Sequence, residues 1–176
     1  MTNAESELKA DHDEIMRFLL KNEPTLATRA GSVLVKALVL AGASEIEVDF
    51  QSHLISYYGE LAGASAHAAA FVEKKAVKRQ YHTYFVWDKK NVNQFFGLFG
   101  PDFAAAMSKK VTAEPAFDDA IRAFLELGNL RNEMVHGNFA AYSLTKTADE
   151  VHALYLRARI FVDQLPVLLR ANYRAE

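Results

Sequence analysis

The sequence predicts an all-α protein, folded as a single helical bundle of about five helices with a kinked C-terminal helix. Apolar residues recur at three- and four-residue spacing over most of the chain. Proline, glycine and capping residues separate these stretches. Only "YHTYFVW" (81–87) has the composition of a strand, and a lone strand would have no partner. With 176 residues, of which 51% are hydrophobic, the chain is long enough to form one core, so we expect a single domain spanning residues 1–176.

Two helices are predicted in the first third of the chain. Apolar residues at helical spacing define the first, and Pro24 favours a break before the second, which begins at about Thr25. Gly42 can bend this second helix. Ser44 followed by Glu47 also has the pattern of a capping box, so the sequence leaves open whether one helix or two cover this stretch.

The middle of the chain contains two segments of different composition. The Ala-rich segment "GASAHAAAFVEKKAVKRQ" (63–80) predicts a third helix with a basic end. Residues 81–103 are dense in aromatic residues and interrupted by Asn, Gly and Pro. This composition predicts a compact connection with one short helix near Val92 to Leu98.

Two further helices are predicted in the last third. Pro115 suits the first turn of one, and Gly137 suits the position that ends it. Thr147 and Glu150 form a capping box at the start of the last helix, and Pro166 is expected to kink it.

Composition excludes several classes of protein. The chain has no cysteine, so it has neither disulfides nor a thiolate metal site. A formal net charge of -2 and a pI of about 6.3 argue against a dedicated duplex-DNA binder. The N-terminal residues lack the basic-then-apolar pattern of a secretory signal. The most apolar run, "GSVLVKALVLAGASEIEVDF" (31–50), is interrupted by charges and reads as too short to cross a membrane. We therefore expect a soluble cytoplasmic protein without a membrane partner.

The stretch "LRNEMVHGNF" (130–139) carries the most chemistry. The guanidinium of Arg131 is always charged and can bind phosphate oxygens through two nitrogens. His136 titrates near neutrality, as proton shuttles do. The two residues lie about 140° apart on an ideal helix, yet both can reach a groove near its end. Such a pair suffices for metal-free RNA cleavage, in which the 2′-hydroxyl of the substrate is the nucleophile. An ordinary helix end, with cations that complement the helix dipole, is the competing interpretation.

A metal site is a second alternative at the same place. Glu133 and His136 have the Glu-x-x-His spacing of di-metal helical bundles. Such a site needs two copies of this motif, and the chain has one. Asp49 and His53 could add ligands, but the set remains incomplete.

Two other charged groups bear on the site. Glu45, Glu47 and Asp49 alternate within an apolar stretch. One that faces inward should hold an arginine such as Arg131, since an unpaired buried carboxylate is costly, but the sequence does not tell which. A basic cluster could meet phosphates, although a solvated helix face is the commoner role of such residues. It consists of Lys74, Lys75, Lys78 and Arg79.

The sequence resembles the RiboL-PSP-type branch of the HEPN superfamily. The superfamily signature is an Arg, usually followed by a polar residue, then a His at a helix end. Here it reads Arg131, Asn132 and His136, followed by Gly137. The segments "FFGLFGPDF" (95–103), "FVWDKKNVNQ" (85–94) and "SEIEVDF" (44–50) extend the resemblance. It covers the chain from about Ala27 to the last helix.

This resemblance implies a bundle that dimerises so that two Arg–His motifs face each other across a cleft. The family includes metal-independent endoribonucleases of toxin–antitoxin, abortive-infection and antiviral systems. The implied catalytic pair is Arg131 and His136, supported by Asn132 and, at the acidic position, Glu47. RNA is the implied substrate, no cofactor is implied, and an antitoxin is a possible protein partner. The family also contains inactive members, so a non-catalytic dimer that binds RNA or protein is the alternative.

Overall fold

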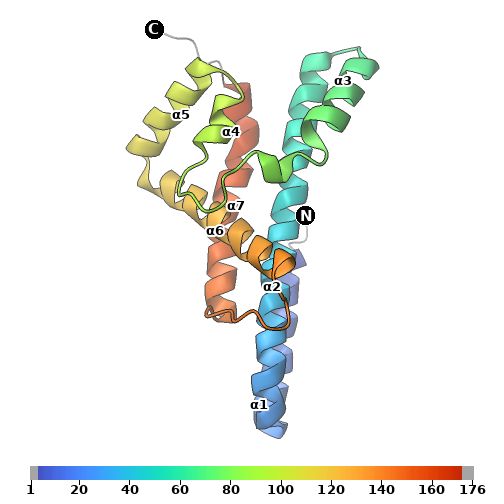
Figure 1. Ribbon diagram of the computed structural model, residues 1–176, viewed down its shortest axis with the longest axis vertical. Helices are drawn as coiled ribbons and strands as arrows, with labels where there is room; N and C mark the ends of the chain where they lie inside the picture. Colours follow the sequence, from blue (N-terminus) through green and yellow to red (C-terminus); the bar gives the residue numbers. More distant parts are fainter. Residues whose placement is uncertain (1–3, 172–176) are drawn as a thin grey trace.

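The computed structural model describes residues 4–171 and contains no strand within that range (Figure 1). The all-α prediction is confirmed. The described residues form seven α-helices: α1 (Ala4–Asn22), α2 (Pro24–Ala62), α3 (Ala66–Val72), α4 (Asn93–Gly97), α5 (Pro101–Ala113), α6 (Pro115–His136) and α7 (Ala148–Arg170). A π-helical turn, η1 (Glu73–Val77), and a 3-10 turn, η2 (Tyr81–Thr83), lie between α3 and α4. Helix α5 lies outside the predicted set, although Pro101 in its first turn and the alanines that follow favour a helix.

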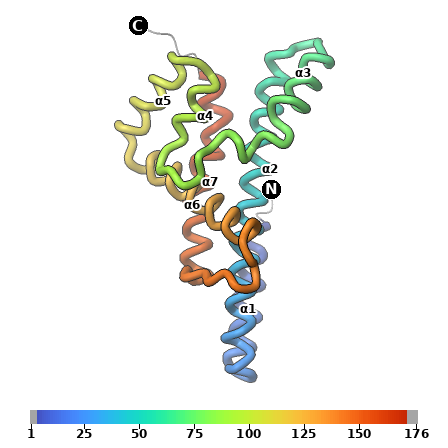
Figure 2. The backbone as a smooth tube through the Cα atoms, viewed as in Figure 1, coloured from blue at the N-terminus to red at the C-terminus, as the bar shows by residue number. Residues whose placement is uncertain are grey.

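Helix α2 runs along the length of the molecule (Figure 2). Helix α1 packs against its first half, and α3 folds back against its end. Helices α6 and α7 pack on each other and on α2, and α4 and α5 lie beside one another. At one end the molecule divides into two arms, one formed by α2 and α3 and the other containing α4 and α5 (Figure 1).

A single continuous helix covers residues 24–62, which settles the question left open at Ser44. Gly42 is buried where α2 meets α7. A Cβ at Gly42 would lie 2.9 Å from Cδ2 of Tyr155, so the glycine permits this close approach of the two helices.

By length and composition, α2 is also apolar enough to cross a membrane, contrary to the expectation from its charges. About 33% of its most apolar 18-residue window is buried inside the molecule. The mostly buried core helix of a soluble protein also passes this test of length and composition, and α2 packs against α1, α6 and α7.

The aromatic-dense connection is folded into the core. Phe50 of α2 is fully buried, and its ring centroid lies 5.4 Å from that of Phe85 and 5.0 Å from that of Phe95. It also contacts Phe124 of α6 at 5.9 Å and Phe161 of α7 at 6.4 Å. Edge-to-face, tilted and stacked aromatic contacts at these distances stabilise packing beyond area burial alone. The segment with strand-like composition is therefore a set of turns anchored by aromatic residues.

The predicted ends of the last two helices are confirmed. Pro115 lies in the first turn of α6. The side-chain oxygen of Thr147 accepts from the Glu150 backbone N–H at 3.2 Å, and the Glu150 carboxylate accepts from the Thr147 backbone N–H at 2.7 Å. Pro166 lies inside α7, which continues past it to Arg170.

Candidate functional site

The Arg–His motif occupies the last two turns of α6, and His136 is the final residue of the helix. The Gly137 N–H donates to the Glu133 carbonyl at 3.0 Å. The backbone of Gly137 is extended (φ -92°, ψ -166°) rather than left-handed. A Cβ at Gly137 would lie only 2.6 Å from the Glu133 carbonyl oxygen. The helix therefore ends where predicted, but the glycine is needed for close approach rather than for a positive φ.

The loop after the helix is held in place by two hydrogen bonds. Lys36 of α2 is buried, and its Nζ donates to the Phe139 carbonyl at 2.9 Å. The Tyr142 hydroxyl donates to the Glu133 carboxylate at 2.7 Å. Burial, with a contribution from Glu133, raises the pKa of Tyr142 to about 12, so this hydroxyl keeps its proton. These contacts fix the position of the helix end.

The carboxylate of Glu133 is thus engaged within the fold. It also accepts from the Asn129 side chain at 2.7 Å. Among residues 4–171, no group of three His, Cys, Asp or Glu side chains is placed to hold a metal ion. The Glu-x-x-His alternative has no ligand set in this part of the chain.

Arg131 is half-buried, and its side chain donates to Oδ1 of Asn132 at 3.1 Å. No carboxylate of the described residues lies within ion-pair distance of the Arg131 guanidinium. His136 is exposed, and its ring makes no hydrogen bond or ion pair within the same range. The helix therefore ends in an accessible imidazole and in a guanidinium that has no counter-ion among residues 4–171.

The three acidic residues of α2 turn out to have different environments. Glu45 accepts from the Glu5 backbone N–H at 3.1 Å. Asp49 forms an ion pair with Arg159 of α7. The expectation that one of these carboxylates holds an arginine is therefore met at Asp49, but the arginine is Arg159 of α7 and not the candidate Arg131.

Glu47 is the acidic residue that faces α6. It lines a narrow cavity of about 10 Å³ together with Arg131 and His82. The shortest distance between the His82 ring and the Glu47 carboxylate is 3.6 Å, from Nε2 to Oε2. Of the proposed site residues, Arg131, Asn132 and Glu47 therefore lie near one another, with His136 at the end of the same helix.

The sequence pattern did not single out His82 as a site residue. It lies on η2, where the Trp87 indole N–H donates to its carbonyl at 3.1 Å. Burial lowers the pKa of His82. Glu47 opposes this shift, whereas Arg131 and His136 reinforce it. The only hint in the sequence is that His82 lies in the aromatic-dense connection, whose burial brings it against α2.

The same cavity explains a glycine in α6. A Cβ at Gly128 would lie 2.0 Å from Cζ3 of Trp87, far inside contact distance. Gly128 therefore allows the indole to pack on α6, one turn before Arg131. Trp87 in turn supports the turn that carries His82.

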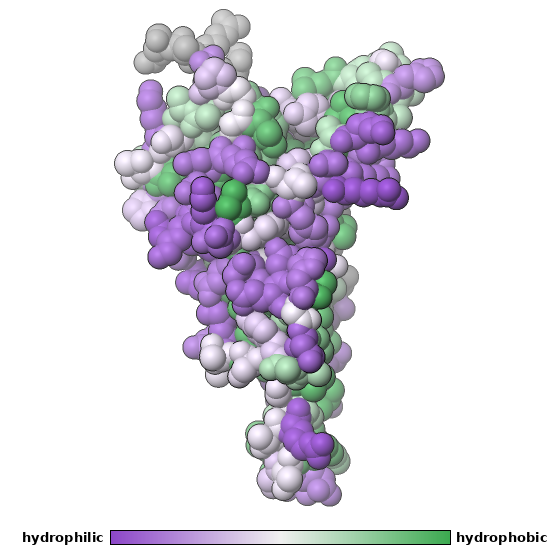
Figure 3. All heavy atoms as spheres, in the orientation of Figure 1, coloured by the Kyte–Doolittle hydropathy of each residue, from purple (hydrophilic) through white to green (hydrophobic). Residues whose placement is uncertain are grey.

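The proposed RNA-binding cluster lies on η1 and on the residues directly after it. Its four side chains are exposed: Lys74, Lys75, Lys78 and Arg79. Lys78 forms an ion pair with Glu73 at 2.5 Å. Lys75 lines a separate cavity of about 470 Å³ between the two arms. Figure 3 shows hydrophilic side chains over this part of the arm and over α6. No described contact joins the cluster to Arg131, so the structure does not bring it into the site.

An all-α bundle that positions an Arg–His pair at a helix end is the arrangement of a HEPN-type domain. The family model described as RiboL-PSP-HEPN matches residues 6–167, and the chain belongs to this family. No curated protein and no solved structure matches the chain significantly. HEPN domains are often ribonucleases, so family membership points to RNA cleavage or RNA binding.

Proposed function

We propose that the protein is a metal-independent endoribonuclease that acts as a homodimer. The observation that supports this most directly is the pairing of Arg131, which has no counter-ion among the described residues, with the exposed His136 at the same helix end. A half-buried guanidinium without a carboxylate is costly unless a ligand supplies negative charge. A phosphate oxygen meets that requirement.

In the proposed reaction the substrate 2′-hydroxyl attacks the adjacent phosphorus. The bond to the 5′-oxygen breaks, which leaves a 2′,3′-cyclic phosphate and a 5′-hydroxyl. Arg131 binds the scissile phosphate and stabilises the negative charge that develops on its oxygens. His136 transfers a proton to or from the reacting oxygens. Asn132 accepts from the Arg131 side chain and so orients it. All these groups come from the chain, so the scheme uses no cofactor.

The surface beside the motif supports a second copy as the partner. Val135 is 50% exposed and Phe139 is 38% exposed, and both flank His136. Burial of such side chains between two copies would favour association. It would also bring two Arg–His pairs to one cleft, where one can act as acid and the other as base. The basic cluster at 74–79 would guide RNA toward that cleft.

The cellular setting proposed is a cytoplasmic toxin or antiviral-defence ribonuclease, restrained by an antitoxin or another protein. This setting rests on the family and not on a described contact. Growth arrest on expression, relieved by His136→Ala, is the outcome it predicts.

The test is cleavage of single-stranded RNA in EDTA by wild type, Arg131→Ala and His136→Ala. We expect each substitution to lower the rate by about 10²- to 10⁴-fold, the range for loss of one acid–base or charge-stabilising group. Equal activity of all three proteins would contradict the assignment. Wild-type activity that disappears in EDTA would indicate a metal enzyme instead. Light scattering should give the mass of a dimer, and a monomer with full activity would contradict the shared cleft.

The second candidate is a non-catalytic HEPN dimer that binds RNA or a protein. The slightly acidic pI of about 6.3 favours it, because it does not suit strong, unspecific attraction of RNA. It predicts a stable dimer that cleaves no RNA and causes no growth arrest.

A further inference from the structure

A histidine outside the Arg–His motif lies beside it in the fold. His82 of η2 lines the narrow cavity of about 10 Å³ together with Glu47 of α2 and Arg131 of α6. Its side chain is 42% exposed, so a ligand can reach the ring from solvent. Within residues 4–171, the one ion-pair contact of the ring is with Glu47, through Nε2. The other nitrogen, Nδ1, is therefore free to meet a substrate.

Glu47 and two aromatic residues set the orientation of the His82 ring. The Gln51 side chain donates to Oε1 of Glu47 at 3.1 Å, and Oε2 lies 3.6 Å from Nε2 of His82. The ring makes a T-shaped contact with Tyr81, at 5.3 Å between centroids, and lies 6.0 Å from the Trp87 ring. A carboxylate beside Nε2 favours the tautomer with its proton on that nitrogen, which leaves the lone pair on Nδ1. General-base histidines have this arrangement, in which a carboxylate stabilises one nitrogen and the other accepts the proton.

The environment of His82 favours a neutral ring. Burial is the main cause that lowers the pKa of His82; Glu47 opposes the shift, and Arg131 and His136 reinforce it. Both residues of the motif therefore act electrostatically on His82. A neutral imidazole is the form that accepts a proton, so His82 is suited to base catalysis beside a guanidinium that can bind phosphate.

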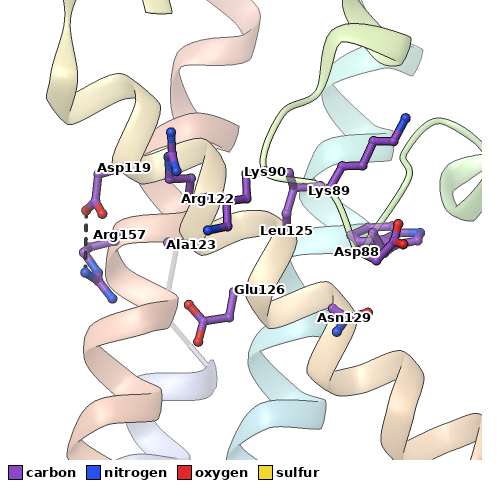
Figure 4. A pocket seen from close by; sticks show the side chains of 11 residues that line it. Asp88, Lys89, Lys90, Asp119, Arg122, Ala123, Leu125, Glu126, Asn129 and Arg157 are labelled. Atoms are coloured by element: carbon purple, nitrogen blue, oxygen red, sulfur yellow. Dashed lines mark ion pairs between the residues drawn. The ribbon is translucent and has the colours of Figure 1, made fainter.

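The acidic residues of α6 are engaged elsewhere. Asp118, Asp119 and Glu126 form ion pairs with cations of α6, α7 and the loop between them. Figure 4 shows the ion pair of Asp119, at another cavity of about 400 Å³. Glu133 accepts from the Tyr142 hydroxyl at 2.7 Å. The helix that carries the motif thus offers no unengaged carboxylate as a base, whereas η2 offers an imidazole.

We propose that His82 is a catalytic residue, the general base that takes the proton of the substrate 2′-hydroxyl. Nδ1 of His82 accepts this proton as the 2′-oxygen forms its bond to phosphorus. His136 donates a proton to the 5′-oxygen as the bond between phosphorus and that oxygen breaks. Proton exchange with water then returns both rings to their starting states.

This assignment rests on the proposed ribonuclease function and deepens it. One chain supplies both the base, His82, and the acid, His136. A second copy of the chain need not provide the base.

The first test measures single-turnover cleavage of a labelled single-stranded RNA between about pH 5 and pH 9, where histidines titrate. His82→Gln is expected to lower the rate about 10²- to 10⁴-fold, as for loss of one acid–base group, and to remove the acidic limb of the pH–rate profile. His53→Gln is the matched control, because burial also lowers the pKa of His53, whose charged neighbours include Arg159 of α7 and neither residue of the motif. It should keep the wild-type rate and profile.

The second test distinguishes the base from the acid. In an RNA whose bridging 5′-oxygen is replaced by sulfur, the leaving group departs as a thiolate and needs no proton. This substrate should restore much of the rate of His136→Ala and leave the defect of His82→Gln unchanged. Restoration of His82→Gln, with no restoration of His136→Ala, would overturn the assignment of the base.

The outcomes separate this proposal from the ribonuclease assignment. If wild type cleaves RNA and His82→Gln has the same rate and profile, the base assignment is wrong and the ribonuclease assignment stands. A slow His82→Gln protein that keeps the acidic limb would give His82 a structural role and also overturn the base assignment. If wild type cleaves no RNA, both proposals are wrong.

Thermal melting checks that each variant is folded. If His82→Gln fails to fold, Glu47→Gln tests the same point with the ring in place. Because Glu47 raises the pKa of His82, this variant should move the acidic limb to lower pH, and an unmoved limb would overturn the base assignment.

Discussion

Helix α2 carries a carboxylate on each of two opposite faces, and each has an arginine and a histidine nearby. Glu47 lies with Arg131 and His82, next to α6. Asp49 pairs with Arg159 of α7. Residues two apart on a helix are rotated by about 200° around its axis. The Glu47 cluster therefore faces α6, and the Asp49 cluster faces α7.

The two clusters contain the same residue types but use them differently. Arg159 pairs with Asp49 and also with Asp163 at 2.7 Å, so its charge is satisfied inside the fold. Arg131 donates to the neutral Asn132, and no carboxylate of the described residues pairs with it. The α7 cluster therefore stabilises the bundle, whereas the α6 cluster leaves a cation for a ligand. An arginine beside an acidic residue is a functional candidate only where the pairing is incomplete.

The largest effect should come from replacing each arginine in turn. Arg131→Ala is expected to lower RNA cleavage by at least about 10²-fold, as for loss of one charge-stabilising donor, with little change in the midpoint of urea unfolding. Arg159→Ala is expected to destabilise the fold by about 1–3 kcal/mol, since it leaves the half-buried Asp49 without its partner. Its activity under folding conditions should stay close to wild type. Steady-state kinetics and urea titration of both variants measure these effects.

The opposite pattern of activity and stability in these two variants would mean that the two clusters do not differ in function. If Arg131→Ala unfolds as easily as Arg159→Ala, Arg131 is a structural residue. If Arg159→Ala is inactive while fully folded, the α7 cluster belongs to the reaction.

A smaller effect is expected at the two carboxylates. Glu47 lies 3.6 Å from His82, which is too far for a strong hydrogen bond, so its influence is electrostatic. An exposed ion pair contributes up to about 1 kcal/mol, which corresponds to roughly a fivefold change in rate. Because Glu47 raises the pKa of His82 against the effect of burial, Glu47→Gln should lower this pKa further. The acidic limb of the pH–rate profile should then move to lower pH.

Asp49→Asn is the matched control, and it should leave the pH–rate profile unchanged while lowering stability. If the Glu47→Gln profile overlays that of wild type, His82 has no part in proton transfer or substrate binding. The profile matters more than the rate here, because a merely structural role of Glu47 would not shift it.

Much of the fold follows from local signals in the sequence. The proline in the first turn of α6, the Thr147–Glu150 capping box and the short helix near Val92 all lie where predicted. Each of these depends on residues within one or two turns of each other. The Ser44–Glu47 pattern misleads because α2 continues through it, held by the contacts of Gly42 and its neighbours with α7.

The candidate site could be predicted only in part. Arg131, Asn132 and His136 share one helix end, so their proximity follows from spacing alone. His82 and Trp87 reach the same place only because the aromatic connection folds onto α2 and α6, and periodicity does not report such long-range contacts. The choice of Glu47 over Asp49 likewise depends on which neighbouring helix supplies an arginine, and that information lies in tertiary packing.

The smallest expected effect concerns the histidines of the two clusters and the dependence of stability on pH. Burial is the main cause that lowers the pKa of both His53 and His82 below the ordinary value of 6.5. For His53, Asp49 and Asp163 oppose the shift, and Arg159 and Arg170 reinforce it.

Below pH 6.5 the unfolded chain binds more protons at these histidines than the folded protein does. The free energy of unfolding should therefore fall as the pH drops below 6.5. His53→Gln should reduce the slope of the free energy of unfolding against pH. His82→Gln should also reduce this slope, because it removes the other titrating ring. Urea unfolding between about pH 5 and pH 8, on either side of the ordinary histidine pKa, measures both. Since Nε2 of His53 is buried without a hydrogen-bond partner in the described part of the chain, a slope unchanged by His53→Gln would mean that water reaches this ring when it is protonated. In that case the α7 cluster would be more accessible to water than its ion pairs suggest, and the two clusters would differ less in their access to solvent.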